Sequence, residues 1–355
     1  MTRAFASVLI DTYNHERFIE KAIVSVLEQD FPAGEREIIV VDDGSTDGTR
    51  EIVRKFEPRV RLLEKKNGGQ ASAFNAGIPE CRGEIVAFLD GDDWWAGKKL
   101  TRVAETMAGD ATIGIVGHGL VVVERDGSER NEILLDGFRF EAGTMEGARL
   151  FQRRGAFLGT SRMTIRSELL RRIGRVPEEI KIQADEYLFT MASVLAGTEI
   201  LPEALTYYRL HEENSFELAG HDVEKSRRKQ RSLAALVKRL THELEKLGID
   251  PQVRRTLMEF THTSAERLRL VVDGGWPWET VKTEWKMYEI LHPDARVSHR
   301  AFKMMTLVAA MVTTPKGFYR AQRALAQNKM YLRARKRWLP VPEMQHIQKD
   351  SRARP

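Results

Sequence analysis

The chain has 355 residues, of which 42% are hydrophobic and 30% are charged, and its formal net charge is +5. This is the composition of a globular protein with a sizeable core, and the length is typical of two domains. The single cysteine, Cys81, excludes an internal disulfide, and no apolar run approaches the ~18 residues of a membrane-spanning helix. Because the apolar stretch at 7–10 is too short for a secretory signal, we expect a cytoplasmic protein.

The first part of the chain alternates strand and helix patterns. Short apolar runs predict strands at 7–10, 37–41, 60–63 and 84–89. Apolar residues at helical spacing predict helices at 18–27, around 52–56 and at 70–76, with Asn14 at the N-cap of the first. This alternation predicts an α/β fold with a mostly parallel sheet and helices on both faces. Ligands of such sheets bind at the carboxyl ends of the strands.

The remainder of the chain changes character twice. Residues 110–215 are mixed, with a hairpin-like turn at 125–128 and a predicted helix at 184–196. From residue 223 to 247 the chain is highly charged, and its leucines recur at helical spacing. We therefore expect an α/β domain at 1–215 and a helical C-terminal region at 216–355.

Three carboxylates follow the predicted strand at 84–89, in the segment Asp90-Gly91-Asp92-Asp93. Unpaired carboxylates this close repel one another, and a divalent cation would relieve that cost. Mn²⁺ and Mg²⁺ prefer oxygen ligands and often bridge carboxylates to substrate phosphates. An isolated Asp-x-Asp would more simply be an acidic turn that caps the next helix, with Asp93 as the cap. The position at a strand end, beside other polar strand ends, favours a metal and diphosphate site.

Two further strand ends are polar. In the segment 42–45, a carboxylate can accept a hydrogen bond from a nucleotide base, and Gly44 permits a tight turn. The alternative is an ordinary turn in which Ser45 caps the next helix. In the segment 11–14, Tyr13 offers a stacking face for a base. The alternative there is a turn that leads into a capped helix.

Four segments, in this order and spacing, resemble glycosyltransferase family 2 enzymes of the GT-A fold: residues 7–14, 41–47, 67–77 and 83–93. The resemblance covers about residues 5–215. It implies a Rossmann-like GT-A catalytic domain that transfers a sugar from a nucleotide-diphosphate sugar with inversion.

The resemblance also implies roles by position. Metal ligands are expected at Asp92, Asp90 and His211, with Asp90 nearer the ribose or a metal-bound water. His211 lies in a segment, 207–215, similar to the family's Tyr-Arg-x-His segment, although a lone histidine there is often structural. Asp185, within 183–189, takes the position of the catalytic base. Nucleotide-sugar contacts are expected from Thr12, Tyr13, Asn14, Glu16, Asp43, Asn67, Gly69, Asn75, Asp90 and Gly91.

Three positions depart from the family pattern. Asp11 stands where the family usually has proline, which we expect to change little. Ala184 stands where an acidic residue usually precedes the base, so that Glu186 competes with Asp185 for that role. The residues 94–97 lack a commonly seen proline.

These features predict an inverting hexosyltransferase that uses Mn²⁺ or Mg²⁺ and, we expect, a UDP-sugar. The acceptor would be a carbohydrate or lipid-linked hydroxyl, in cell-envelope or polysaccharide biosynthesis. A sugar nucleotidyltransferase would need a Gly-rich basic loop after the first strand, where residues 11–16 stand instead. A nucleotide-sugar-binding protein without catalysis is disfavoured by the carboxylates Asp90, Asp92 and Asp185.

The segment 316–337 contains eight Lys or Arg residues and no acidic residue. With apolar residues at helical spacing, it predicts a basic amphipathic helix within 300–340 that lies on an anionic membrane, at the inner face. The alternative is a solvated helix packed on its own domain. No nucleic-acid motif accompanies the charge, so we expect no nucleic-acid partner.

Overall fold

The computed structural model describes residues 5–132, 137–154, 158–211, 223–292, 295–314 and 317–318. Its first part confirms the predicted alternation, with element ends within a few residues of those expected. The elements are β1 (Ala6–Thr12), α1 (Ile19–Leu27), β2 (Arg36–Asp42), α2 (Thr49–Arg54), β3 (Arg61–Glu64), α3 (Gln70–Gly77) and β4 (Ile85–Asp90).

The central sheet is mixed, so the expectation of a mostly parallel sheet describes only its first half. The strand order is β3-β2-β1-β4-β9-β6-β10-β5, and the first four strands are parallel. Beyond them, β9 (Met163–Arg166) is antiparallel to both β4 and β6 (Ile113–Val123). β10 (Gly197–Arg209) is parallel to β6, and β5 (Trp94–Trp95) closes the edge antiparallel to it. The four residues of β9 are too few to carry a periodic signal, so the sequence gives no sign of this reversal.

The predicted hairpin and helix in the middle of the chain are confirmed. β6 turns at 124–128 into β7 (Glu129–Glu132), and the two strands pair antiparallel. β8 (Phe138–Phe140) pairs with β10 and is followed by α5 (Met145–Arg154). The predicted helix is α7 (Ala184–Leu195), which follows the short α6 (Ser167–Ile173).

Alternate residues of the parallel strands pack in two different hydrophobic clusters, each shared with a set of helices. Val8 and Ile10 pack in one hydrophobic cluster with α1 and α4 (Lys99–Gly109). Leu9 belongs to the other cluster, with α3, α6 and α7. This pleat also determines which strand-end side chains face the α3 and α7 side of the sheet.

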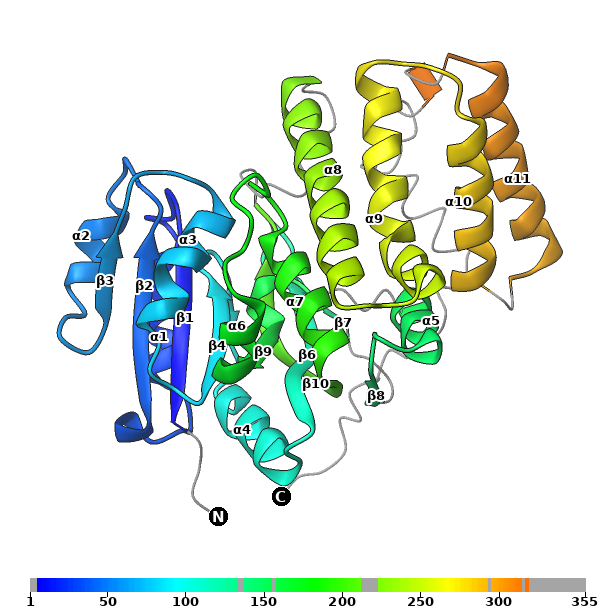
Figure 1. The fold of residues 1–355 in the computed structure, drawn as a ribbon. Helices are drawn as coiled ribbons and strands as arrows, with labels where there is room; N and C mark the ends of the chain where they lie inside the picture. The colour runs from blue at the N-terminus through cyan, green and yellow to red at the C-terminus, as the bar shows by residue number, and fades with distance from the viewer. Residues whose placement is uncertain are drawn as a thin grey trace, which may run out of the picture.

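Four helices follow and stand side by side beyond α7 (Figure 1): α8 (Val223–Lys246), α9 (Pro251–Val272), α10 (Trp278–Leu291) and α11 (Val297–Val312). Buried leucines of α8 and α9 join the same hydrophobic cluster as α7. The proposed boundary at 215/216 lies outside the described residues, as does almost all of the basic segment 316–337. Among the described helices, none has the length and apolar character needed to cross a membrane.

The predicted helix caps are wrong in detail. Asn14 does not cap α1, which begins at Ile19; its Oδ1 instead accepts a hydrogen bond from the Thr46 amide at 2.8 Å. Ser45 does not cap α2, because its hydroxyl accepts from the Asn14 amide at 2.9 Å. Asp93 does not cap α4, whose N-cap is Lys98. These side chains tie neighbouring loops together at the strand ends.

Candidate active site

A cavity of about 800 Å³ lies at the carboxyl ends of β1, β2 and β4. The parallel register places Asp11 opposite Asp90 and Thr12 opposite Asp42, which brings the polar strand ends to one edge. Nine of the predicted site residues line this cavity: Thr12, Tyr13, Asn14, Asp43, Asn67, Gly69, Asp90, Asp92 and Asp185. The fold therefore brings together residues that are up to 173 positions apart in sequence, from Thr12 to Asp185.

Three other predicted contact residues, Glu16, Asn75 and Gly91, do not line the cavity. The Glu16 carboxylate accepts from the Gly48 amide at 2.8 Å and thus joins two loops. The buried Asn75 side chain bonds both the amide and the carbonyl of Val176, each at 2.8 Å. A Cβ at Gly91 would lie 2.6 Å from Thr12 Oγ1, so only glycine fits there without displacement. These three residues therefore contact other parts of the protein and do not line the cavity.

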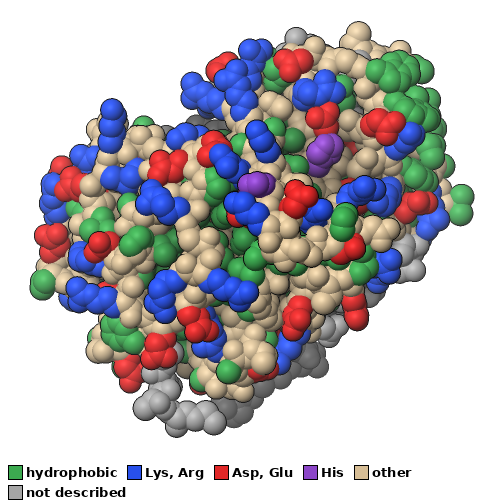
Figure 2. All heavy atoms as spheres, in the orientation of Figure 1, with side chains coloured by type: hydrophobic (Ala, Val, Ile, Leu, Met, Phe, Trp, Pro, Cys, Tyr) green, Lys and Arg blue, Asp and Glu red, His purple; other side chains and the backbone are tan. Residues whose placement is uncertain are grey.

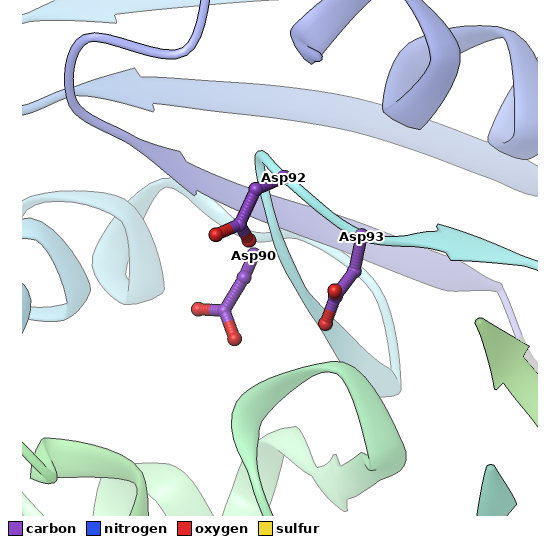
Figure 3. Close-up of side chains that lie close together, drawn as sticks. All are labelled: Asp90, Asp92 and Asp93. Carbon is purple, nitrogen blue, oxygen red and sulfur yellow. The ribbon is translucent and has the colours of Figure 1, made fainter. Parts of the chain in front are cut away.

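The carboxylates of Asp90, Asp92 and Asp93 gather at the end of β4 (Figure 3). One oxygen from each lies within 4.8 Å of the others. Asp92 Oδ2 lies 2.8 Å from His211 Nε2, and Asp93 accepts from the Arg209 amide at 3.1 Å. Such a set of hard oxygen donors fits a divalent cation of the Mg²⁺ or Mn²⁺ type.

The pKa shifts of these three carboxylates also favour a cation site. Desolvation raises the pKa of Asp90 and Asp93 well above the ordinary range, and neighbouring carboxylates add to the effect. Desolvation also acts on Asp92, but the hydrogen bond to His211 and the nearby His15 together hold its pKa below the ordinary value. Asp92 therefore stays ionised, and a cation beside it would offset the repulsion that Asp90 experiences.

His15 is a site residue that the sequence reasoning missed. It lines the cavity, its Nε2 lies 3.8 Å from Asp92 Oδ2, and its Nδ1 lies 3.2 Å from Thr12 Oγ1. Asp92 thus lies between two histidines, His15 and His211. The available signal was its place between Asn14 and Glu16, on a loop that follows a parallel strand.

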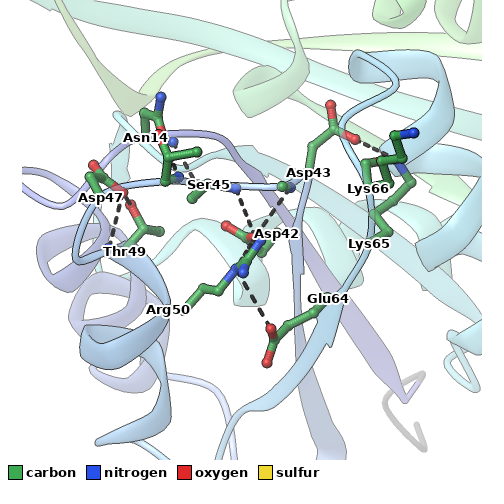
Figure 4. Close-up of polar contacts among 12 residues, drawn as sticks. Asn14, Asp42, Asp43, Ser45, Asp47, Thr49, Arg50, Glu64, Lys65 and Lys66 are labelled. Atoms are coloured by element: carbon green, nitrogen blue, oxygen red, sulfur yellow. Dashed lines mark hydrogen bonds and ion pairs between the residues drawn. The ribbon is translucent and has the colours of Figure 1, made fainter.

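Asp43 lies at the end of β2 and organises the loop that precedes α3 (Figure 4). Its carboxylate accepts from the amides of Gly68, at 3.0 Å, and Gly69, at 2.7 Å, and pairs with Lys65. Gly69 has φ +86°, which explains glycine at this position. The neighbouring Asp42 is fully buried and accepts from Arg50 Nε at 2.7 Å, so it has a structural partner.

Asp185 and Glu186, adjacent at the start of α7, face different cavities. Asp185 lines the large cavity, and its Oδ2 accepts from the Thr160 amide at 3.1 Å and the Thr160 hydroxyl at 3.2 Å. Glu186 lines a second cavity of about 220 Å³ beside α8 and α9, where it pairs with the Thr261 hydroxyl. Burial raises the pKa of Asp185 to about 6 and that of Glu186 to about 7. Of these two neighbours, Asp185 is the one that reaches the acidic strand ends.

Residues 7–174 match the family model described as glycosyl transferase family 2. Over 214 residues the chain is 31% identical to an uncharacterized glycosyltransferase of Nostoc sp., an alignment that covers 59% of this chain and 66% of that protein. Residues 7–174 of the chain are a glycosyltransferase family 2 domain.

Other relatives match shorter parts of the chain. The poly(ribitol-phosphate) beta-N-acetylglucosaminyltransferase TarS of Staphylococcus aureus is 41% identical over 92 residues, which is 25% of this chain and 16% of TarS. The matched segments thus span less than two thirds of these relatives' own lengths.

Solved structures support the GT-A fold over more of the chain. TarS 1–349 in complex with UDP-GlcNAc aligns with a TM-score of 0.54 at 19% identity, covering 86% of this chain and 90% of that one. The mannosyltransferase PcManGT of Pyrobaculum calidifontis, in complex with GDP-Man and Mn²⁺, aligns with a TM-score of 0.54 at 20% identity, covering 95% and 88%. The sheet and its helical layers are those of a GT-A domain.

Proposed function

We propose that this protein is a metal-dependent inverting glycosyltransferase that moves a sugar from a nucleotide-diphosphate sugar to an acceptor hydroxyl. The observation that carries the proposal is the shared cavity. Asp185 lines the same cavity as Asp90 and Asp92, whose carboxylates lie at the end of β4. A single base opposite a site for the leaving diphosphate is what one displacement requires.

The donor nucleoside would lie over the ends of β1 and β2. Tyr13 is 44% exposed at the cavity and offers a ring for base stacking. Thr12, Asn67 and the loop held by Asp43 line the same region. UDP and UDP-GlcNAc in TarS, and GDP-Man in PcManGT, support a nucleotide-diphosphate sugar here, and we propose a UDP-sugar.

Asp92, Asp90 and His211 would hold the divalent cation, with His15 beside them. When bound, the cation would supply positive charge to the departing diphosphate. The Mn²⁺ in the complex of PcManGT supports a divalent cation as the cofactor. The protein's own contribution is to keep Asp92 ionised and oriented, through its 2.8 Å contact with His211.

In the reaction, Asp185 takes the proton of the acceptor hydroxyl as that oxygen attacks the anomeric carbon of the donor sugar. The bond between that carbon and the diphosphate oxygen breaks on the opposite face, and the nucleoside diphosphate leaves with the electron pair. The configuration at the anomeric carbon therefore inverts. The hydrogen bonds from Thr160 hold the Asp185 carboxylate in one orientation during the proton transfer.

The rate should depend on pH through Asp185. Burial raises the pKa of Asp185 to about 6, and only the deprotonated carboxylate can accept a proton. The turnover rate should therefore rise as pH increases through about 6 and fall about tenfold per pH unit below it. Initial rates at saturating donor and Mn²⁺, measured from pH 4.5 to 8.5, test this. A rate that stays constant down to pH 4.5 would argue against a buried carboxylate as the base.

The donor class can be tested by thermal shift with and without Mn²⁺. A donor present at about 100 times its Kd should stabilise the folded protein by about 2.7 kcal/mol, so a UDP-sugar should stand out in a panel that includes GDP- and dTDP-sugars. Donor hydrolysis in the presence of Mn²⁺ then checks catalysis, and EDTA should abolish it. Binding without turnover would indicate a non-catalytic protein. Conversely, formation of a nucleotide sugar from a nucleoside triphosphate would indicate a nucleotidyltransferase.

We further propose that the acceptor is a carbohydrate or lipid-linked hydroxyl of a cell-envelope polysaccharide, reached at an anionic membrane surface. The outward face of α11 carries apolar side chains at helical spacing: Val297 (83% exposed), Met305 (63%), Val308 (48%) and Val312 (77%). Figure 2 shows hydrophobic side chains along this edge of the molecule. The eight basic residues of 316–337 follow directly in the sequence, which favours anionic lipid as the partner.

Liposome flotation tests the membrane surface. The full chain should float with vesicles that contain 30 mol% phosphatidylglycerol. With vesicles of pure phosphatidylcholine it should remain in the bottom fraction. The double variant Met305→Ser and Val308→Ser should lose most of this binding because it removes exposed apolar area from α11. Phe260→Ser, which removes an exposed ring from α9, serves as the control and should float like the wild type. Equal flotation of the double variant would contradict a role for α11.

A further inference from the structure

A short turn, Thr160–Arg162, lies between the proposed base and the acidic cluster. Its first two residues are almost fully buried, with Thr160 at 0% and Ser161 at 3% exposed. Neither was singled out from the sequence. We propose that this turn is a positioning element that fixes the Asp185 carboxylate relative to the carboxylates of Asp90 and Asp93. This inference rests on the proposed function, because it assigns the turn to the same site.

Thr160 bonds the proposed base, Asp185. Its amide and its hydroxyl both donate to the same oxygen of Asp185, at 3.1 and 3.2 Å. The hydroxyl in turn accepts from Gln70 Nε2 at 2.9 Å, and Gln70 Oε1 accepts from the Ala184 amide at 3.0 Å. Gln70 thus joins Thr160 to the first residue of α7. The base is fixed through both its carboxylate and its helix.

Ser161 bonds two residues of the acidic cluster. Its hydroxyl donates to Asp93 Oδ2 at 2.6 Å and accepts from the Asp90 amide at 3.1 Å. The same hydroxyl lies 3.4 Å from Asp90 Oδ2. One side chain therefore bonds the carboxylate of Asp93 and the backbone of Asp90, so that a rotation of Ser161 would release both residues.

The backbone of Ser161 is anchored by three donors that converge on its carbonyl oxygen. These are Trp95 Nε1 at 3.0 Å, Lys99 Nζ at 3.3 Å and Thr206 Oγ1 at 2.6 Å. Lys99 is fully buried, and its Nζ lies 3.2 Å from the centre of the Trp95 ring. Three donors thus share the two lone pairs of one carbonyl oxygen. Because the donors come from three different elements, this peptide has little freedom to rotate.

Substitutions at Ser161 and at Thr160 should change different properties of the site. Residues that orient metal ligands typically change metal affinity 10–100-fold when removed, so about that loss of Mn²⁺ affinity is expected for Ser161→Ala. Thr160→Val removes the hydroxyl's bond to Asp185, together with the acceptor for Gln70 Nε2, and should leave Mn²⁺ affinity unchanged. Because that bond lowers the pKa of Asp185, its loss should move the acid limb of the pH–rate profile to higher pH.

The experiment measures both quantities on the full chain. Mn²⁺ binding is followed by isothermal titration calorimetry at pH 7.5, and donor turnover is followed from pH 4.5 to 8.5. Thr164→Val is the matched control, because Thr164 is buried in β9 and its hydroxyl has no hydrogen-bond partner among the described residues. This control should match the wild type in both measurements. Circular dichroism melting shows whether each variant is folded.

The expected result is a separation: Ser161→Ala weakens Mn²⁺ binding with an unchanged acid limb, and Thr160→Val shifts the acid limb with unchanged Mn²⁺ binding. Wild-type Mn²⁺ affinity in a folded Ser161→Ala variant would overturn the inference. An unmoved acid limb in folded Thr160→Val would do the same. A wild-type protein that binds Mn²⁺ and yet turns over no nucleotide sugar would instead contradict the proposed function.

Discussion

Asp185→Asn should lower sugar transfer by about 10²–10⁴-fold, the range that general-base residues contribute, while nucleotide-sugar binding stays close to wild type. The amide has the size of the carboxylate but cannot accept the acceptor proton. It can still accept the hydrogen bonds from the Thr160 amide and hydroxyl, so the local structure should persist. The donor would contact other residues at the strand ends, so the thermal shift produced by donor and Mn²⁺ should be retained.

Glu186→Gln is the matched control for this prediction. Glu186 is also a carboxylate, adjacent in sequence and slightly more buried, but it lines the smaller cavity with Thr261. Its conversion to Gln should leave transfer within a few-fold of wild type, and any effect should appear first in the melting temperature. If Asp185→Asn transferred sugar at the wild-type rate, the assignment would fail, and Glu186 would become the candidate base.

The choice between these two residues illustrates what sequence can and cannot provide. Both carboxylates stand in the right segment, and the usual acidic neighbour is replaced by Ala184, so the pattern leaves two candidates. Neighbouring residues on a helix point about 100° apart, because an α-helix has 3.6 residues per turn. Which one faces the cavity depends on where α9 packs, and α9 contributes Thr261 from 75 residues farther along the chain.

The parallel half of the sheet was predictable because each strand is a short apolar run that ends in polar residues. Once β1, β2 and β4 are parallel neighbours, Asp43 and Asp90 must come to the same edge, with Asp11 between them. The antiparallel half was not predictable, since β9 has only four residues. Ser161 immediately precedes this half, so its contacts with Asp90 and Asp93 depend on tertiary structure alone.

Asp92→Asn should be the most damaging change in the acidic cluster. Of the three clustered carboxylates, Asp92 is the one whose pKa is held below the ordinary value, despite desolvation, by His211 and His15. It is therefore the carboxylate most ready to bind a cation. The asparagine keeps the shape of the side chain and can still bond His211, but it removes the charge. Mn²⁺ affinity and Mn²⁺-dependent turnover should then fall together, with turnover at least about 10²-fold lower, because metal catalysis supplies several kcal/mol of charge stabilisation.

Calorimetric Mn²⁺ titration and donor hydrolysis, each with and without EDTA, measure this effect. Asp110→Asn is the control, because Asp110 follows α4 and pairs with Arg139, outside the cavity lining. Asp93→Asn should be milder than Asp92→Asn, since desolvation already favours the protonated form of Asp93. Ser161 and the Arg209 amide donate to different oxygens of Asp93, so the asparagine, with one acceptor oxygen, keeps one of these two bonds. A larger loss of Mn²⁺ affinity in Asp93→Asn than in Asp92→Asn would shift the metal anchor to Asp93. The diphosphate would then lie closer to the turn at Ser161 than to the two histidines.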